Sequence, residues 1–351
     1  MRHRLRLFVI LVVVSVVAGM LFEQAVIWTD PGRLRQLFHQ LFGWTLGSSL
    51  IWGFELFFVP GKWGKAIRRQ NFLAVIAVKS LILVAIFVFT IVASRLILHG
   101  SFDPALFIQP AVYQSAVFVF LLVAVLQAIS QVVRIVGGRV LLNFILGKYH
   151  HPMREERLFM FLDLTGSTPL AERLGDIGVQ TMITQFFFDI TEPIVEFGGE
   201  IHRYVGDQVV VTWPLVDNAA IIRAIRCYFA IADKVRSEAP EYERVFGTVP
   251  KFRVGLHGGP VVVSECGDRK QEIVYFGDTI NTAARIEQQC KAFECPFLVS
   301  GNLVARIDLP ATLQAQSMGF VQLRGRKTET ELFTITPGSA GTATLIEGQR
   351  S

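Results

Sequence analysis

The chain has 351 residues, of which 52% are hydrophobic and 18% are charged, and its formal net charge is +5. The mean hydropathy of +0.45 excludes an ordinary soluble enzyme. Nearly all long apolar runs lie between residues 1 and about 137, whereas the sequence from about 150 onward has a globular composition. We therefore expect an N-terminal membrane part followed by a soluble part.

The positive charge lies partly in Lys and Arg residues beside the apolar runs. No basic stripe with interleaved aromatic residues is present, so we expect no nucleic-acid partner. The spacing of the four cysteines matches no zinc pattern. All four lie in the soluble part, where we expect reduced thiols: Cys227, Cys266, Cys290 and Cys295.

Four apolar segments have about the length that a helix needs to cross a bilayer. They cover residues 7–28, 44–60, 71–97 and 111–136. The first follows three arginines, as a signal peptide would, but no small-residue cleavage site follows it, so we interpret it as a retained helix. The sequence thus predicts an all-α domain of four transmembrane helices over residues 1–137, with the lipid bilayer as its partner.

Lys and Arg residues indicate the orientation of these helices. They gather at the N-terminus, in the 61–70 loop and after the fourth segment, while the 98–110 loop has none. We therefore expect a multi-pass protein of the cell inner (plasma) membrane, with the N-terminus and the soluble domain in the cytoplasm. Since Gly/Pro-broken helix pairs and an internal repeat are absent, the pattern favours an anchor or sensor over a transporter.

Two ionisable residues, Glu55 and Lys79, fall inside these apolar segments. If they pair, each lowers the cost of burying the other, and the pair would orient helices or sense a signal. The alternative is that both residues extend toward the membrane surface from helices that end earlier than expected.

A short amphipathic helix is predicted to connect the two parts, over residues 138–154. Apolar residues recur there at three- and four-residue spacing, and the helix would pair with its copy in a dimer or lie along the membrane. His150 and His151 face different sides of such a helix, so we do not expect them to bind a metal. The Gly-, Ser- and Thr-rich tail, residues 337–351, is predicted to be disordered.

The soluble part begins with a strand over residues 157–163 that ends in the carboxylate of Asp163. The next residues turn into a helix, which Ser167 or Thr168 can cap while Pro169 suits its first turn. Exposed N–H groups at that helix start form an anion site suited to phosphates. The strand end therefore combines a carboxylate with a phosphate cradle.

A second carboxylate, Asp207, is predicted at the tip of a hairpin. Two short strand patterns flank Gly206-Asp207. By itself a Gly-Asp turn indicates only a turn. If its strands neighbour the strand ending at Asp163, the two carboxylates can hold Mg²⁺ on a triphosphate, because Mg²⁺ favours few carboxylates plus substrate oxygens.

A third pattern is a strand over residues 274–276 that leads through Gly277 to a helix. Asn281 and Arg285 are four residues apart and share one face of that helix. An amide and a guanidinium on one face can bind a ribose oxygen and a developing phosphate charge, although the same face could simply be solvated.

Together, Phe-Leu-Asp-Leu-x-Gly-Ser, Tyr-Val-Gly-Asp and Gly-Asp-Thr-x-Asn-x-x-x-Arg, in this order, resemble the class III nucleotidyl cyclase catalytic domain. The resemblance covers residues 155–336. It implies an α+β domain with a ferredoxin-like βαββαβ core. The whole chain, with its Gly-Lys-Tyr-x-x-Pro connector, looks like a bacterial membrane-anchored adenylate cyclase that converts ATP to cyclic AMP.

The resemblance also implies residue roles. Asp163, Asp207 and the backbone carbonyl of Leu164 would bind two Mg²⁺ or Mn²⁺ ions per site. Asn281 would orient the ribose and Arg285 would stabilise the transition state, both from the other subunit of a homodimer. The remaining implied contacts are to the triphosphate and come from Thr165, Gly166, Ser167 and Arg326.

Two positions depart from the family pattern. Arg203 stands where the family has a purine-reading lysine, and the two are not equivalent donors. Val274 stands where the family has Asp or Thr, and it cannot hydrogen-bond to a base. These departures leave open a GTP-using enzyme or a non-catalytic receptor with the cyclase fold. A diguanylate cyclase fits less well, because Val-Gly-Asp-Gln replaces Gly-Gly-Asp-Glu-Phe.

Three other polar residues are interpreted as structural. His257 has no nucleophile paired with it, so we expect a residue at a strand end. Glu200 and His202 precede the hairpin and are expected on strand faces.

Overall fold

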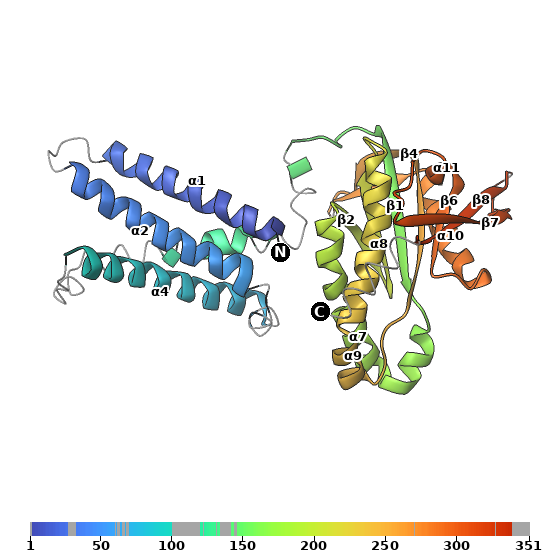
Figure 1. Ribbon diagram of the computed structural model, residues 1–351, viewed down its shortest axis with the longest axis horizontal. Helices are drawn as coiled ribbons and strands as arrows, with labels where there is room; N and C mark the ends of the chain where they lie inside the picture. The colour runs from blue at the N-terminus through green and yellow to red at the C-terminus, as the bar shows by residue number, and fades with distance from the viewer. Residues whose placement is uncertain are drawn as a thin grey trace. The chain divides into compact units, whose positions relative to one another are not determined.

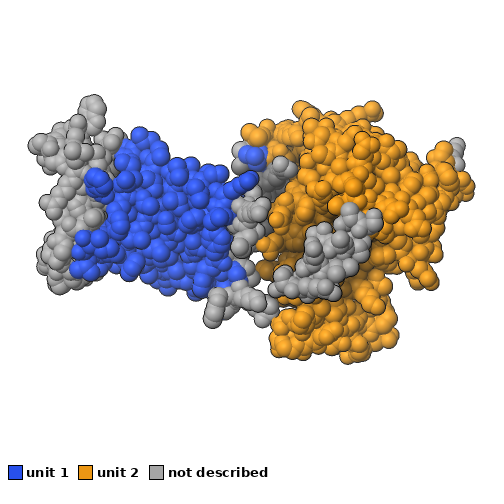
Figure 2. All heavy atoms as spheres, viewed as in Figure 1, with its two compact units in different colours: residues 1–142 blue, residues 143–351 orange. Residues whose placement is uncertain are grey.

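The computed structural model describes residues 2–26, 33–59, 61, 64, 67, 70–99, 120, 121, 123–130, 132, 133, 142, 143, 146–269, 271–326 and 328–338. The chain folds into two compact units, residues 1–142 and residues 143–351 (Figure 2). Each unit is described by itself.

The first unit is helical (Figure 1). Its helices are α1 (Arg2–Val26), α2 (Arg33–Gly53) and α4 (Phe72–His99), and α2 continues into a π-helix, η1 (Phe54–Phe58). Helix α2 packs against both α1 and α4. Gly19 allows α1 to approach α2 closely, because a Cβ there would collide with the Trp44 ring.

Two helical stretches among the described residues are long and apolar enough to cross a membrane, Leu41–Phe58 and Phe72–Ser94. They correspond to the second and third expected segments. The apolar part of α1, Leu5–Leu21, is shorter, and the expected 111–136 segment lies largely outside the described residues. Apolar side chains such as Leu73 and Leu81 are exposed, as contact with lipid requires. The four-helix domain itself remains a prediction.

Glu55 and Lys79 form an ion pair inside this unit. Lys79 Nζ lies 2.7 Å from Glu55 Oε2, and Gln127 Nε2 donates to Glu55 Oε1 at 3.0 Å. Lys79 is only 1% exposed, so it does not extend to a surface of this unit. The pair links α4 to the π-helix η1. A π-helical turn is rare and frequently marks a functional position.

The connector differs from the expected helix over residues 138–154. Residues 142 and 143 are helical, but residues 146–149 form a turn and the first strand already begins at Met153. The buried Tyr149 ties this turn to the second unit: its hydroxyl donates to Glu155 Oε1 at 3.0 Å, and its carbonyl accepts from the Glu265 amide.

The second unit is built on an eight-stranded mixed sheet in the order β2-β3-β1-β4-β6-β8-β7, with β5 also paired to β4. Its strands are β1 (Met153–Leu164), β2 (Glu200–Val205), β3 (Gln208–Pro214), β4 (Phe252–Cys266), β5 (Glu272–Phe276), β6 (Phe297–Ser300), β7 (Leu313–Val321) and β8 (Thr330–Pro337). Its helices are α7 (Ser167–Glu196), α8 (Ala219–Ser237), α9 (Ala239–Phe246), α10 (Asp278–Ala292) and α11 (Gly301–Val304).

The order β2-β3-β1-β4, with α7 and α8 as the connections, is the expected ferredoxin-like βαββαβ core. Pairing within this core is antiparallel, and the β4–β6 pair is parallel. Helices α7 and α8 cover one face of the sheet and α10 covers the other. Successive strand residues point to opposite faces, and accordingly Phe297 and Val299 join the core under α8, whereas Leu298 packs with Ile286 of α10.

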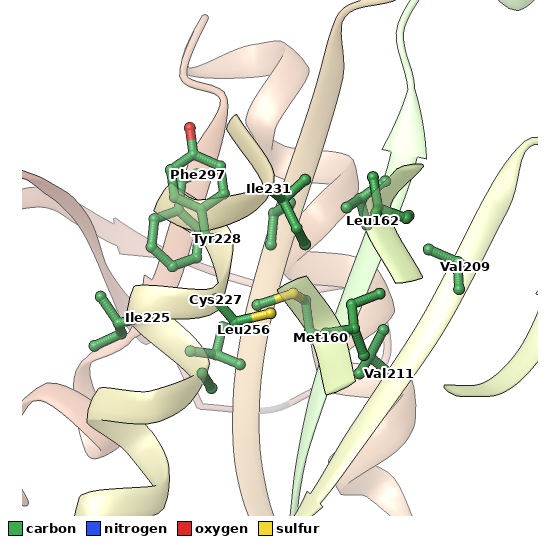
Figure 3. Close-up of a cluster of buried hydrophobic side chains, with 14 of the residues drawn as sticks. Met160, Leu162, Val209, Val211, Ile225, Cys227, Tyr228, Ile231, Leu256 and Phe297 are labelled. Atoms are coloured by element: carbon green, nitrogen blue, oxygen red, sulfur yellow. The ribbon is translucent and has the colours of Figure 1, made fainter. Parts of the chain in front are cut away.

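The larger core lies between the sheet and α7 and α8. Helix α8 contributes Ile221, Ala224, Ile225, Tyr228 and Ile231 at three- and four-residue spacing. The Tyr228 ring stacks on Phe297 at a centroid distance of 4.1 Å (Figure 3). This core fixes β1 and β3 side by side, and these are the strands whose ends carry Asp163 and Asp207.

Candidate active site

The two predicted metal-binding carboxylates lie at the ends of neighbouring strands. Asp163 is near the end of β1 and is paired in register with Gln208, the residue after Asp207. Gly206 has φ +61 and forms the predicted hairpin tip with Asp207, since this conformation favours glycine. Burial raises the pKa of Asp163, the Arg253 guanidinium opposes this shift, and the charge of Asp207 adds to it. Sequence reasoning therefore placed both carboxylates correctly.

These groups suit a hard divalent cation. Asp163, Asp207 and the backbone at Leu164 offer only oxygen donors, the kind that Mg²⁺ and Mn²⁺ prefer. Within the described residues, no group of three or more His, Cys, Asp or Glu side chains is placed to hold a metal. Two carboxylates and one carbonyl leave coordination positions of such a cation for substrate oxygens and water.

Sequence reasoning missed two charged residues beside Asp163. Arg253 of β4 lies opposite Asp163, and its Nη2 donates to Asp163 Oδ2 at 2.9 Å. Arg253 Nε lies 3.5 Å from Oε1 of the buried Glu287, and neither of these two atoms makes a hydrogen bond. Burial raises the pKa of Glu287 to about 7, and Asp163 adds to the shift. Arg253 could have been found from the sequence, because it is a charged residue within the otherwise apolar pattern of β4.

The expected phosphate cradle follows directly after β1. The Thr165 amide donates to the Lys251 carbonyl at 2.7 Å, and α7 begins at Ser167. The expected side-chain cap was wrong: Gly166, at φ +76, occupies the cap position, and no side chain there forms a cap hydrogen bond. A helix start without a side-chain cap keeps N–H groups available for an anion.

Asn281 and Arg285 lie on α10, which begins directly after Gly277 as predicted. Asn281 Nδ2 donates weakly to the Gly277 carbonyl at 3.4 Å. Arg285 Nη1 lies 3.8 Å from Asp278 Oδ1 and is buried without a hydrogen bond. Arg326 reaches the same carboxylate, with its Nε 3.0 Å from Asp278 Oδ2. The structure thus brings Arg285 and Arg326 together, although they lie far apart in the sequence.

A cavity of about 390 Å³ opens beside the start of α10. Polar side chains from five elements or their loops line it: Glu156, His257, Asp278, Thr279, Asn302, Arg306 and Arg326. His257 lies inside β4 and not at the strand end expected for it. It is buried with its Nδ1 2.7 Å from Ser300 Oγ, and these surroundings agree with a structural role.

Within one chain, the two carboxylates predicted to bind metal and the start of α10 lie at opposite ends of the β1–β4 pair. Asp163 is in register with Arg253, and the cavity residue Glu156 is in register with Pro260. Thr279 donates to the Pro260 carbonyl at 2.7 Å, which places the start of α10 there. Seven strand residues separate the two ends, about 23 Å. Helix α10 runs back from its start toward Arg253, which its Glu287 reaches. The Arg285 guanidinium, in contrast, lies 3.8 Å from Asp278 at the start of the helix and not at the aspartates.

The two predicted base-reading positions lie on β2 and β5. Arg203 of β2 pairs with Glu272 of β5, with Nη2 2.7 Å from Oε2, and Val274 lies two residues further along β5. Both partners of this ion pair are more than a third exposed, so a ligand can displace it at low cost. Glu200 and His202 of β2 contact residues of β1 and β5: Glu200 pairs with Arg157, and the His202 ring packs on Tyr275.

The family model described as the adenylate and guanylate cyclase catalytic domain matches residues 151–336, more than half of the chain. The chain belongs to this family. Adenylate cyclase 2 of Rhizobium meliloti (strain 1021) is 38% identical over 211 residues, which cover 60% of this chain and 58% of that protein. Adenylate cyclase 1 of the same strain is 27% identical over 187 residues, 52% of this chain and 28% of that protein.

The chain thus spans only part of these cyclases. A solved structure of a bacterial light-regulated adenylyl cyclase aligns with a TM-score of 0.52 at 20% identity, over 64% of this chain and 66% of that one, which shows the shared cyclase fold. The class III cyclase resemblance is confirmed, and the diguanylate cyclase alternative is set aside by the family match.

Proposed function

We propose that this chain is a membrane-bound adenylate cyclase that converts ATP to 3′,5′-cyclic AMP and pyrophosphate at the interface of a homodimer. The observation that carries the proposal is the division of the site: paired carboxylates lie at one end of β1, and the start of α10, where Arg285 reaches Asp278, lies at the other. Two copies arranged about a two-fold axis would join unlike ends and form two equivalent sites.

In this proposal, the residues of one protomer hold the triphosphate end of ATP. Asp163, Asp207 and the Leu164 carbonyl would hold two divalent cations, which supply charge neutralisation on the phosphates and a more acidic 3′-hydroxyl when bound. The N–H groups of the Gly166–Ser167 turn would face phosphate oxygens. Arg253 now neutralises Asp163, and a bound cation would release it toward the phosphates.

The partner protomer would supply the other half. Asn281 would fix the ribose, so that its 3′-oxygen lies in line with the α-phosphorus. That oxygen forms a bond to phosphorus as the bond to the leaving pyrophosphate oxygen breaks, and the 3′-hydroxyl proton is lost to water. Arg285 donates to the oxygens where charge grows, and Arg326 binds the pyrophosphate portion. These assignments follow the family motif residue by residue.

A base-promiscuous or GTP-using cyclase is the second candidate, and a specific observation favours it. Arg203 is held by Glu272, and Val274 offers no polar atom to a base. Neither residue provides the donor and acceptor pair that would select adenine firmly. A non-catalytic receptor is less consistent with the chain, because both carboxylates, Asn281 and Arg285 are present.

The membrane part of the proposal is supported by two helices that are long and apolar enough to span a bilayer and by the apolar surface of the first unit. The Lys and Arg distribution favours a cytoplasmic N-terminus and a cytoplasmic cyclase unit, where ATP is available. We retain four spans and a plasma-membrane location as part of the proposal.

The decisive experiment is an activity assay of the full-length chain in membranes, with Mg²⁺ or Mn²⁺ and with either ATP or GTP. We expect cyclic AMP from ATP, and an Asp207→Asn control without activity. Cyclic GTP alone would favour the second candidate, and no cyclic product from either nucleotide would refute the enzyme proposal.

A further inference from the structure

Asp278, the first residue of α10, contacts two arginines with its two carboxylate oxygens. Oδ2 lies 3.0 Å from Arg326 Nε, and Oδ1 lies 3.8 Å from Arg285 Nη1. The two guanidinium groups come from different elements, one from α10 and one from the turn before β8. Two adjacent cations repel each other, so a shared carboxylate is what allows them to lie side by side.

The backbone around Asp278 holds this carboxylate in place. Gly277 takes φ +143, which turns the chain from β5 into α10 at this residue. Thr282 Oγ1 donates to Asp278 Oδ2 at 3.3 Å. A negative charge at the first turn is also favoured by the helix dipole. The position of Asp278 is therefore set by the helix start, and the arginines adjust to it.

The arginine side of the contact is also shaped by the fold. Gly325 has φ +77, and it faces the Arg285 guanidinium so closely that an added Cβ would lie 3.4 Å from Nη2. The Arg326 amide donates to the Leu323 carbonyl at 3.0 Å, which closes the turn. A side chain at position 325 would crowd Arg285, so this glycine keeps the space between the two arginines open.

The exposed fractions of the three side chains indicate that these ion pairs orient the two arginines and contribute little to folding. The side chain of Asp278 is 55% exposed, and those of Arg285 and Arg326 are 28% and 27% exposed. Pairs this exposed contribute little to folding stability. Asp278 and Arg326 both line the 390 Å³ cavity, and Arg285 Nη1 is buried without a hydrogen bond. The arginines therefore keep donors available for an anionic ligand.

We propose that Asp278 is a positioning residue for cyclisation, which holds Arg285 and Arg326 in the geometry that meets the phosphates of the nucleotide. This inference rests on the proposed function and assigns a role to a residue outside the predicted site. Asp278 touches no reacting atom. It lowers the cost of bringing the two cations together before substrate binds, and it competes with phosphate oxygens for Arg326. Preorganisation of this kind affects turnover more than binding.

The test compares Asp278→Asn and Asp278→Glu with the unchanged full-length protein in membranes. An asparagine keeps a side-chain oxygen that can accept from Thr282 but loses the charge, while a glutamate keeps the charge on a longer side chain. We expect Asp278→Asn to lower kcat about tenfold with KM for ATP within about threefold, because orientation is lost while the phosphate ligands remain. Inhibition by pyrophosphate should become stronger, since the competing carboxylate is gone. Asp278→Glu should recover part of kcat.

Asp217→Asn is the matched control. Asp217 also lies at the start of a helix, accepts the Ala220 amide at 2.9 Å and pairs with Arg223 at 3.4 Å, but it does not line the cavity. We expect the kcat of Asp217→Asn to equal that of the unchanged protein.

Wild-type kcat in Asp278→Asn would overturn the inference while leaving the proposed function intact. A lower kcat that comes with a lower melting temperature and no recovery in Asp278→Glu would also overturn it, because that result describes a purely structural helix start. An unchanged protein inactive with both ATP and GTP would refute the proposed function itself.

Discussion

Asp207→Ala and Arg285→Ala remove opposite halves of the proposed site. Each variant alone should lose activity by about 10²–10³-fold, the effect of removing one essential electrostatic contact. Asp207 adjoins one end of the β1–β4 pair, whereas the Arg285 guanidinium lies at Asp278, beside the other end, so the proposed site takes the two residues from different chains. In a dimer of one chain of each kind, one site collects both defects and the other site keeps every native residue.

When equal amounts of the Asp207→Ala and Arg285→Ala chains associate at random, half of the dimers contain one chain of each kind. Each of these mixed dimers has one intact site out of two. The mixture should therefore regain about one quarter of the wild-type activity. Two different affinity tags, used in succession, isolate the mixed dimers, which should show about half of the wild-type activity per dimer. Cyclic AMP formation is the readout.

The control pairs Asp163→Ala with Asp207→Ala, two changes in the same half of the site. Mixed dimers of these chains carry one defect in each site, so no activity should return. Inactive Asp207→Ala/Arg285→Ala dimers, once shown to form, would refute the shared site. Equal recovery in the control pair would refute it as well.

Glu55→Gln or Lys79→Met leaves a buried group without its partner, so each variant should destabilise the detergent-solubilised chain by about 3–5 kcal/mol in thermal unfolding. The double variant should lose less stability than the sum of the two single losses. Strictly additive losses would argue against the pair. Burial lowers the pKa of His257 to about 4, so the unfolded state binds more protons and stability falls by about 3 kcal/mol as the pH drops from about 6.5 to 4. When the free energy of unfolding is measured as a function of pH, His257→Gln should remove this pH-dependent loss. An unchanged dependence of the unfolding free energy on pH would contradict the prediction. Arg203→Lys with Val274→Asp should raise the kcat/KM ratio of ATP over GTP at least about tenfold, and an unchanged ratio would show that these positions do not read the base.

The local elements of the cyclase unit could be predicted because each has a short-range cause. The hairpin at Gly206-Asp207 follows from alternation and turn residues, and α10 follows from Gly277 and the helical spacing after it. The start of β1 was placed four residues late, at Arg157 rather than Met153. Its first residues are polar and form a strand only because they pair with β4, around Pro260 to Val263.

The contacts that surround the site were not predictable in this way. Arg253 reaches Asp163 across 90 positions of sequence, and Arg326 reaches Asp278 across 48. Neither pairing leaves a periodic pattern, because a strand register or a loop path decides which charges meet. The Glu55–Lys79 pair was one of two alternatives in the sequence, and the packing of α2 and its π-helical continuation against α4 selected it.

By itself, the sequence determined the division into an apolar and a globular part, the strand and turn that carry the two carboxylates, and the helix face with Asn281 and Arg285, since these depend on composition and local spacing. Only the tertiary structure decided that the carboxylates and the start of that helix lie at opposite ends of β1, and that Asp278 unites two arginines. The physical reason is that side chains far apart in the chain meet through strand register and packing against the core, which no local pattern encodes.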